Sequence, residues 1–514
     1  MRLGIDLGTT RIVAAAVDRG NYPVVTFEDG DGTSWEWFPP LIAARGSERL
    51  YGWDAWRVQA EPGYTIIRSI KRILEDAGPA TLVQLGDASL PVHQILEEMM
   101  RALKTALLEK SSLNAKPGVA LEVMLGVPAN ANSNQRFLTV DPVQRAGFSV
   151  LGLLNEPSAA SIEYGHRKRG TGADERVLIY DLGGGTFDVS LVDIEGREHS
   201  VIASEGISML GGDDFDILLA DLTLEAAGIK ADLTQAEIFR LHEECRTKKE
   251  ALHPNTKRIT IDLGSVREGW DDVSIPVDVF YASCRPLITQ TIEASEKLLN
   301  AQRVDAVYIT GGGSELPLVS RMLKEVFGRR VHRSAYTRSG TAIGLAIQAD
   351  TQAGYKLRER FTRHFGVWRE GQSDREVLFD ILFAKGTMLP GAGEAAIELK
   401  RSYVPVHNVG HFRYLECSQV GEAGRPVGDI AVWDEIRFPF DASLHTAENL
   451  AGIAVNQTAV EVLEPVEEVY SCDANGSVGV TIRNTGSGYE RTYRLGRWSQ
   501  SGDSVVPGKK RKKR

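Results

Sequence analysis

The sequence predicts an α/β protein with two similar lobes, followed by a separate all-β domain. The stretch "GIDLGTTRIVAAAVD" at Gly4–Asp18 returns in related form as "IYDLGGGTFDVSLVD" at residues 179–193. Asp181 follows Asp6 by 175 residues, a spacing that suits a duplicated domain rather than a short solenoid repeat. After about residue 355 the periodic helical patterns end, and short alternating stretches punctuated by turn signals replace them, as in a β-sandwich.

Length and composition indicate a soluble protein of several domains. The chain has 514 residues, of which 42% are hydrophobic and 25% charged, and its formal net charge is −10. A negative net charge does not indicate a nucleic-acid-binding protein. No secretory signal or membrane-spanning run is recognisable in the sequence. The four cysteines lack the spacing of a metal site or a disulfide framework. We expect a cytoplasmic protein with reduced thiols.

Strands and helices are predicted to alternate through the first 350 residues. Each repeated stretch reads as two strands joined by a glycine turn. The other elements predicted there are helices at 93–111, 155–167, 238–253 and 286–301, a strand at 120–128, and a strand, glycine turn and helix at 305–327. The domain boundaries that follow are 1–352 for the two-lobed domain, 353–364 for a linker, 365–500 for the β-sandwich and 501–514 for a disordered tail ending in "KKRKKR".

The repeated glycine turns predict a phosphate-binding site. Glycine lets backbone N–H groups approach an anion closely, since no Cβ intervenes, and threonine hydroxyls add donors. Two facing copies would clamp a phosphate chain from both sides. Asp6, Asp181 and Asp188 stand beside these turns, and carboxylates there suit hydrated Mg²⁺. No GxxxxGK[ST] motif is present, so a Walker-type site is excluded.

Four motifs carry a specific resemblance: "GIDLGTT", "LLNEPSAASIEYG", "IYDLGGGTFDVSLVD" and "MLGGDDFD". In this order and spacing they resemble the signatures of the heat-shock 70 (DnaK-type) chaperone family. The resemblance implies a duplicated actin-like (ribonuclease-H-like) two-lobed ATPase domain over residues 2–350 and, more weakly, a substrate-binding β-sandwich over 365–500. The helical lid that follows in the family is not expected in this divergent chain.

The resemblance also assigns residues to roles. Asp6 and Asp181 would arrange the waters of Mg²⁺, Lys71 would be the catalytic lysine, and Glu156 and Asp188 would orient the attacking water and bind a monovalent cation such as K⁺. Thr186 completes the catalytic set. The residues implied to bind ATP or ADP are Gly8, Thr9, Thr10, Gly183, Gly184, Gly185, Gly211, Gly212, Lys249, Gly311, Gly312 and Gly313.

The adenosine pocket and the linker depart from the family pattern. Arg246 replaces an acidic ribose contact, His253 replaces a small hydroxyl residue, and Glu315 stands where an arginine normally packs on adenine. Glu250 likewise replaces an arginine or an apolar residue. We therefore expect weaker ATP binding than in a typical member. The linker is basic rather than acidic and leucine-rich, which puts its coupling role in question.

In the β domain, "VLFDILFAKGTMLP" resembles the strand and loop beside the family's peptide channel. Leu378, Phe379, Phe412 and Tyr414 are the candidate lining of an apolar cleft for an extended peptide. The alternative is that these side chains fill the sandwich core, and the residues alone favour neither.

The leading functional hypothesis is an ATP-dependent chaperone that hydrolyses ATP and binds extended apolar segments of unfolded proteins. Its implied partners are client polypeptides, a J-domain co-chaperone and a nucleotide exchange factor, with no sequence-specific nucleic acid. The basic tail would contact anionic surfaces. Two alternatives stay open: a small-molecule kinase of the same fold, and a nucleotide-bound scaffold or holdase without appreciable hydrolysis.

Overall fold

The structure, a computed structural model, describes residues 1–74, 77–78, 81–116, 118–168, 174–370, 377–391, 393–447, 449–458, 463–474 and 476–495. The predicted basic tail lies outside these ranges. The described chain divides into two compact units. The first unit comprises Met1–Ala131 and Leu138–Leu357, and the second comprises Asn132–Phe137 together with the residues from Arg358 onward.

A four-stranded sheet in the first unit contains the first glycine hairpin. Its strand order is β11-β10-β1-β2, in which β1 pairs in parallel with β10 and antiparallel with β2. The register joins Leu7 to Ile12, so that residues 8–11 form the turn. The strands are β1 (Arg2–Leu7), β2 (Ile12–Ala16), β10 (Glu122–Val127) and β11 (Ser149–Asn155).

A six-stranded sheet contains the second hairpin in the same setting. Its order is β18-β17-β12-β13-β14-β19, with β12 parallel to β17 and antiparallel to β13. Leu182 pairs with Phe187, so this turn is residues 183–186. The strand pattern around the two hairpins is therefore the same. The strands are β12 (Glu175–Leu182), β13 (Phe187–Glu195), β14 (Glu198–Ile207), β17 (Ala306–Thr310), β18 (Val331–Arg333) and β19 (Lys356–Arg358).

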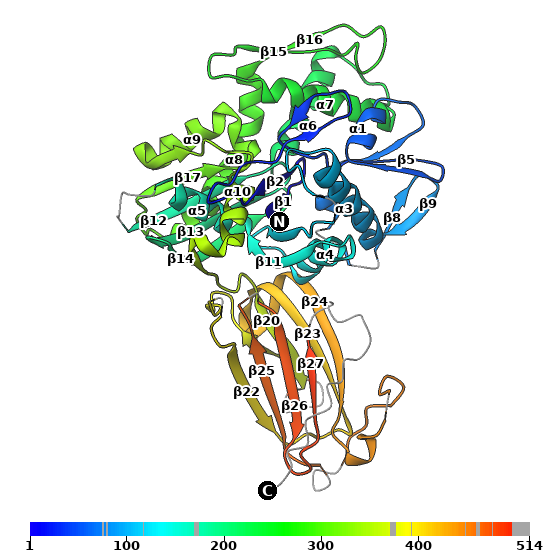
Figure 1. Cartoon of the computed structure of the whole chain (residues 1–514), viewed down its shortest axis with the longest axis vertical. Coiled ribbons are helices and arrows are strands. Elements are labelled where there is room, and N and C mark those ends of the chain that lie inside the picture. The colour runs from blue at the N-terminus through cyan, green and yellow to red at the C-terminus, as the bar shows by residue number, and fades with distance from the viewer. Residues whose placement is uncertain are drawn as a thin grey trace. The chain divides into compact units, whose positions relative to one another are not determined.

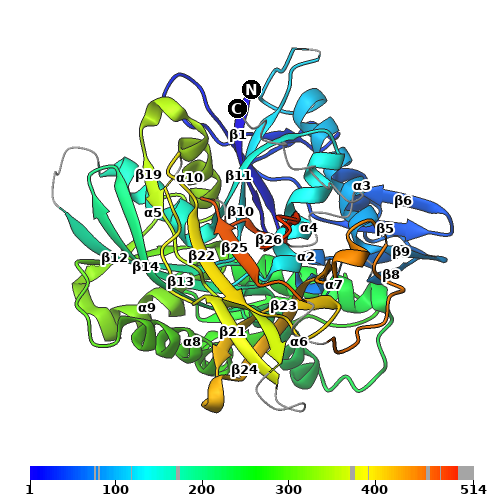
Figure 2. The same ribbon diagram turned by 90° about the horizontal axis from the view of Figure 1, so that it is seen from below.

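Helices cover both sheets (Figures 1 and 2). Helices α5 and α10 pack so closely that a Cβ on Gly344 would lie 1.8 Å from the carbonyl oxygen of Ala159. Only glycine permits this approach. The principal helices are α3 (Val92–Glu109), α4 (Ser133–Arg145), α5 (Glu156–Arg167), α6 (Gly212–Ala227), α7 (Gln235–Glu250), α8 (Val277–Leu299), α9 (Pro317–Phe327) and α10 (Gly340–Ala349).

Shorter elements complete the first unit. The residues around Lys71 form α2, a helix of a single turn. These elements are β3 (Phe27–Glu28), β4 (Ser34–Trp35), β5 (Ile42–Arg45), β6 (Glu48–Tyr51), β7 (Thr65–Ile67), β8 (Leu82–Leu85), β9 (Ala88–Pro91), β15 (Arg258–Ile261), β16 (Val273–Pro276), α1 (Trp53–Val58) and α2 (Ile70–Ile73).

The second unit contains two antiparallel four-stranded sheets with orders β21-β20-β23-β24 and β22-β25-β26-β27. One hydrophobic core joins them, with Phe365 and Tyr414 from the first sheet and Tyr470 and Val480 from the second. The strands are β20 (His364–Glu370), β21 (Val377–Phe383), β22 (Ile397–Tyr403), β23 (Val409–Val420), β24 (Pro426–Pro439), β25 (Val466–Cys472), β26 (Val478–Asn484) and β27 (Glu490–Arg494).

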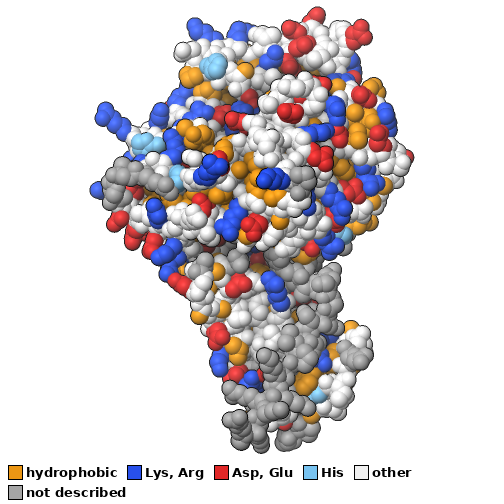
Figure 3. Space-filling model, viewed as in Figure 1, with side chains coloured by type: hydrophobic (Ala, Val, Ile, Leu, Met, Phe, Trp, Pro, Cys, Tyr) orange, Lys and Arg blue, Asp and Glu red, His pale blue; other side chains and the backbone are white. Residues whose placement is uncertain are grey.

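Acidic and basic side chains are interspersed over the visible face of the first unit (Figure 3). None of the helices in the described ranges is long and apolar enough to cross a membrane.

Candidate functional site

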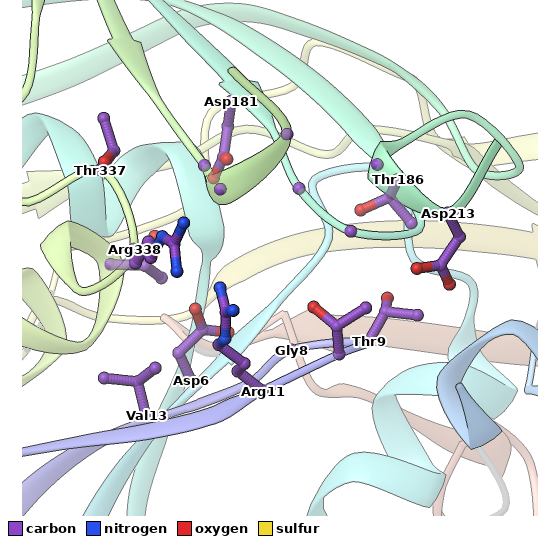
Figure 4. A pocket seen from close by; sticks show the side chains of 18 of the residues that line it. Asp6, Gly8, Thr9, Arg11, Val13, Asp181, Thr186, Asp213, Thr337 and Arg338 are labelled. Atoms are coloured by element: carbon purple, nitrogen blue, oxygen red, sulfur yellow. The ribbon is translucent and has the colours of Figure 1, made fainter. Parts of the chain in front are cut away.

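The three glycine turns and the residues around them line one pocket in the first unit. The empty volume of the pocket is about 810 Å³, counting the part that is open to solvent. Figure 4 shows Thr9 and Thr186 facing each other from the two hairpin turns. The predicted residues that line it are Asp6, Gly8, Thr9, Thr10, Lys71, Glu156, Asp181, Gly183, Gly184, Thr186, Gly212, Lys249, Gly311, Gly312 and Gly313.

The two hairpin turns touch each other. A Cβ on Gly184 would lie 2.7 Å from the Cγ2 and Oγ1 atoms of Thr10, and one on Gly185 would lie 2.6 Å from the Oγ1 atom of Thr9. Any side chain at either glycine would separate the turns. Backbone N–H groups and threonine hydroxyls from two distant parts of the sequence therefore converge on a space suited to an anion.

The third glycine turn packs against the end of β12. Gly311 has a φ of 83°, and a Cβ there would lie 2.3 Å from the carbonyl oxygen of Leu182 and 2.4 Å from the Oδ1 atom of Asp181. Both the left-handed backbone and the close contact require glycine. This turn thus lies beside the second hairpin turn at the same edge of the sheet.

A cluster of buried carboxylates surrounds the Lys71 ammonium. The Nζ atom of Lys71 lies 2.5 Å from the Oε1 atom of Glu156. Burial and the neighbouring Glu156 raise the pKa of Asp6 and of Asp188 to about 7, although Lys71 opposes the shift. Burial and the other carboxylates also raise the pKa of Asp181 well above its usual value. Burial alone would lower the pKa of Lys71, but Glu156, Asp6 and Asp188 raise it.

These carboxylates fit a hydrated divalent cation. Asp6, Asp181, Asp188 and Glu156 are oxygen ligands, which Mg²⁺ prefers, and one ammonium does not neutralise four carboxylates. Burial, together with repulsion from neighbouring carboxylates, raises the pKa values of Asp6, Asp181 and Asp188, so their negative charges are unfavourable in the empty site. Among the described residues no group of three or more His, Cys, Asp or Glu side chains is arranged to hold a metal ion directly.

Helices α6 and α7 contribute a second lysine. The Nζ atom of Lys249 donates to the carbonyl oxygen of Gly212 at 2.6 Å and lies 2.6 Å from Oδ1 of Asp216. Burial raises the pKa of Asp216 to about 6 against the effect of Lys249. Gly211 lies against the second hairpin turn, since a Cβ there would be 2.6 Å from the Gly184 backbone. Gly212 and Lys249 thus line the pocket, and Gly211 lies behind them against the second hairpin turn.

The sequence matches the family described as Hsp70 protein over residues 2–361. The chain belongs to the Hsp70 family. Among its curated relatives are proteins named "Chaperone protein HscA homolog". The one from Vibrio vulnificus is 33% identical over 95% of this chain and 76% of its own length, and the one from Pseudomonas fluorescens is 32% identical over 96% and 77%. A third, from Vibrio parahaemolyticus, is 29% identical over 95% and 76%.

Two other residues that the Hsp70 resemblance singled out, Asp188 and Gly185, lie beside residues of this pocket. Asp188 is buried on β13, where its Oδ1 atom accepts a hydrogen bond from the backbone N–H of Ala129 at 2.9 Å. Gly185 contacts Thr9 as described above.

Several pocket residues were not identified from the sequence. Arg11, Val13, Asp213, Asp216, Thr337, Arg338 and Thr341 also line the pocket of this Hsp70 chain. Asp213 and Asp216 lie in the quoted motif "MLGGDDFD", which was a usable signal. Arg338 lies in the segment before α10, where no motif marked it.

The structure corrects part of the predicted peptide site. Phe412 and Tyr414 are 5% and 0% exposed and belong to the core between the two sheets, because alternate residues of β23 point inward. They cannot line an open cleft here. Leu378 is 47% exposed, and the ring of Phe379 packs 5.7 Å from that of Trp368.

Proposed function

We propose that this chain is an ATP-dependent Hsp70 chaperone whose first unit is a duplicated actin-like ATPase. The observation that carries the proposal is the contact between two hairpin turns of equivalent topology, Gly184 on Thr10 and Gly185 on Thr9, beside a buried lysine and carboxylates. ATP bound in the pocket that both turns line would be held by backbone N–H groups at its phosphates. The Hsp70 relatives support the same activity.

In this mechanism the chain positions the phosphates and compensates their charge. Phosphoryl transfer depends on positioning and electrostatic stabilisation more than on covalent chemistry. Bound Mg²⁺, held through water by Asp6 and Asp181, would neutralise phosphate charge. The hydroxyl groups of Thr9, Thr10 and Thr186 would donate hydrogen bonds to phosphate oxygens. Lys71 places positive charge beside the γ-phosphate.

Glu156 and Asp188 orient the attacking water, and a monovalent cation such as K⁺ is assigned to the same carboxylates. Glu156 also keeps Lys71 in place through their 2.5 Å ion pair. Asp188 is fixed by its bond from Ala129. The carboxylates of Glu156 and Asp188 that would orient the attacking water are therefore already held in place before the nucleotide binds.

The second unit is the proposed substrate-binding domain, with unfolded client polypeptides as ligands. Leu378, on β21, is the exposed apolar residue of the predicted set. A J-domain co-chaperone and a nucleotide exchange factor are the proposed partners, and the cytoplasm is the proposed compartment. The basic segment at 509–514 is proposed to bind anionic surfaces; its deletion should reduce sedimentation with anionic vesicles at low salt.

Phosphate release from ATP, measured with and without an unfolded client, tests the proposal. Wild type should turn over slowly and be stimulated by the client, whereas Thr186→Ala should lose most of this activity. Turnover only in the presence of a sugar or polyol would instead support the kinase alternative. ATP binding without hydrolysis under any condition would support the scaffold alternative.

A further inference from the structure

Glu315, which stands where the resemblance expects an arginine, is itself bound by an arginine. Its Oε2 atom accepts hydrogen bonds from Nε of Arg338 at 2.9 Å and from Nη2 at 2.5 Å. Its Oε1 atom accepts a hydrogen bond from Oγ1 of Thr337 at 2.5 Å. Both carboxylate oxygens are therefore engaged by side chains of the segment before α10. Glu315 is not among the residues that line the pocket, whereas Arg338 and Thr337 are.

Glu250, the second unexpected carboxylate, is engaged in the same way. Its Oε2 atom lies 2.6 Å from Nη2 of Arg11 and 3.2 Å from Nη1 of Arg338, and its Oε1 atom lies 3.3 Å from Nε of Arg246. Burial alone would raise the pKa of Glu250, but these three arginines lower it to about 2. Every carboxylate oxygen of the two glutamates therefore already has at least one partner within the protein.

Arg338 is held at two edges of its guanidinium group. Glu315 binds Nε and Nη2, and Glu250 binds Nη1. These in-plane contacts fix the orientation of the plane and leave its faces for other groups. The Arg338 side chain is 37% exposed, and its Cγ lies 3.8 Å from where a Cβ on Gly312 would be. Figure 4 shows Arg338 and Arg11 close together at one end of the pocket.

A planar cation that lines a pocket suits an aromatic ligand. Guanidinium faces stack on aromatic rings, and stacking of a nucleic-acid base on a planar side chain is tolerant of base identity. We propose that the nucleobase of the bound nucleotide stacks on Arg338, and that Glu315 and Glu250 are positioning residues that hold its plane. This inference rests on the proposed nucleotide-binding function. It replaces the expectation that the two glutamates leave the base without a stacking partner.

The test compares ATP with a ligand that has phosphates but no base. Binding of Mg-ATP and of Mg-tripolyphosphate is measured by displacement of a fluorescent ATP analogue from the full chain. Arg338→Met keeps an unbranched apolar side chain but removes the planar cation. The control is Arg330→Met, an exposed arginine in the segment after α9 that does not line the pocket.

We expect Arg338→Met to weaken ATP binding about tenfold and tripolyphosphate binding less than twofold, with neither changed by Arg330→Met. Glu315→Arg should also weaken ATP binding, because it removes the partner of Arg338 and adds a like charge. Equal losses for ATP and tripolyphosphate, unchanged ATP binding in Arg338→Met, or tighter ATP binding in Glu315→Arg would each overturn the assignment.

The same experiment separates this inference from the proposed function. If wild type binds ATP and Arg338→Met binds it equally well, the base lies elsewhere, but the nucleotide-binding function stands. If wild type binds neither ATP nor tripolyphosphate, the proposed function and the role of Arg338 both fail.

Discussion

The ammonium of Lys71 forms a partly buried ion pair with Glu156, with 2.5 Å between Nζ and Oε1, although the two residues lie 85 positions apart. Lys71 comes from the one-turn helix α2, and Glu156 is the first residue of α5. The side chains are 17% and 9% exposed. An ion pair so removed from water has a defined geometry, which suits a catalytic group better than a surface lysine.

Lys71→Ala should lower single-turnover ATP hydrolysis by about a hundredfold or more, the scale of losing one preorganised electrostatic group. ATP affinity should stay within several-fold, because the glycine turns hold the phosphates independently. Rapid-quench hydrolysis and equilibrium binding measure the two quantities. Lys116→Ala, at an exposed lysine outside the pocket, is the control. Hydrolysis at the wild-type rate in Lys71→Ala would remove Lys71 from the mechanism.

Gly184→Ala should abolish nucleotide binding, because the new methyl group would lie 2.7 Å from Thr10 and force the hairpin turns apart. Gly452→Ala is the control, since a Cβ there meets nothing within 4 Å. Calorimetric titration with ADP compares the two variants. ADP affinity close to wild type in Gly184→Ala would show that the contact between the turns is not required.

The ion pair between Arg11 and Glu250 connects the first hairpin turn to the end of α7 at 2.6 Å. Its removal should free the two parts of the first unit to separate around the nucleotide. Arg11→Met should therefore release a fluorescent ADP several-fold faster in stopped flow. The Arg11 guanidinium also lies 5.3 Å from the ring of Trp37, so a change in tryptophan fluorescence should accompany the substitution. An unchanged release rate would show that this ion pair does not restrain opening.

Asp188 predicts a pH dependence of stability in the nucleotide-free and Mg²⁺-free protein. Its pKa is raised from 3.8 to about 7 by burial and by Glu156. Between pH 4 and pH 7 the folded state therefore binds a proton that the unfolded state has lost, and stability decreases as the pH rises. Asp188→Asn lacks this titration.

The free energy of unfolding of Asp188→Asn, minus that of wild type, should accordingly increase as the pH rises from 4 to 7, by up to about 1.4 kcal/mol per pH unit. Urea denaturation in the presence of a chelator measures the difference between the two proteins, in which the titrations of groups remote from residue 188 cancel. A difference that stays constant from pH 4 to pH 7 would contradict the raised pKa.

The repeated hairpins were predictable from sequence because each is a local motif. The turns, Asp6, Asp181 and the helix beginning at Glu156 depend on residues close in the chain. Arg338 and Arg11 were not predictable, since their importance arises from Glu250 and Glu315, and Glu250 lies 239 positions from Arg11. Pairings of this kind follow from tertiary packing, which no spacing rule describes.

The same limit applied to the sandwich, where alternation along a strand identifies two faces but not which face is internal. Phe412 is 5% exposed in the core, whereas Leu378 is 47% exposed.

Phe412→Ala should therefore destabilise the second unit by about 3–5 kcal/mol through loss of burial and the cavity left behind. Leu378→Ala should change stability by less than about 0.5 kcal/mol. Urea unfolding measures both, and binding of a fluorescent apolar peptide to each folded variant separates stability from client binding. If Leu378→Ala lowers peptide affinity while its stability is unchanged, Leu378 contacts the client. Equal peptide affinity in Leu378→Ala and wild type would place the client site elsewhere on the second unit.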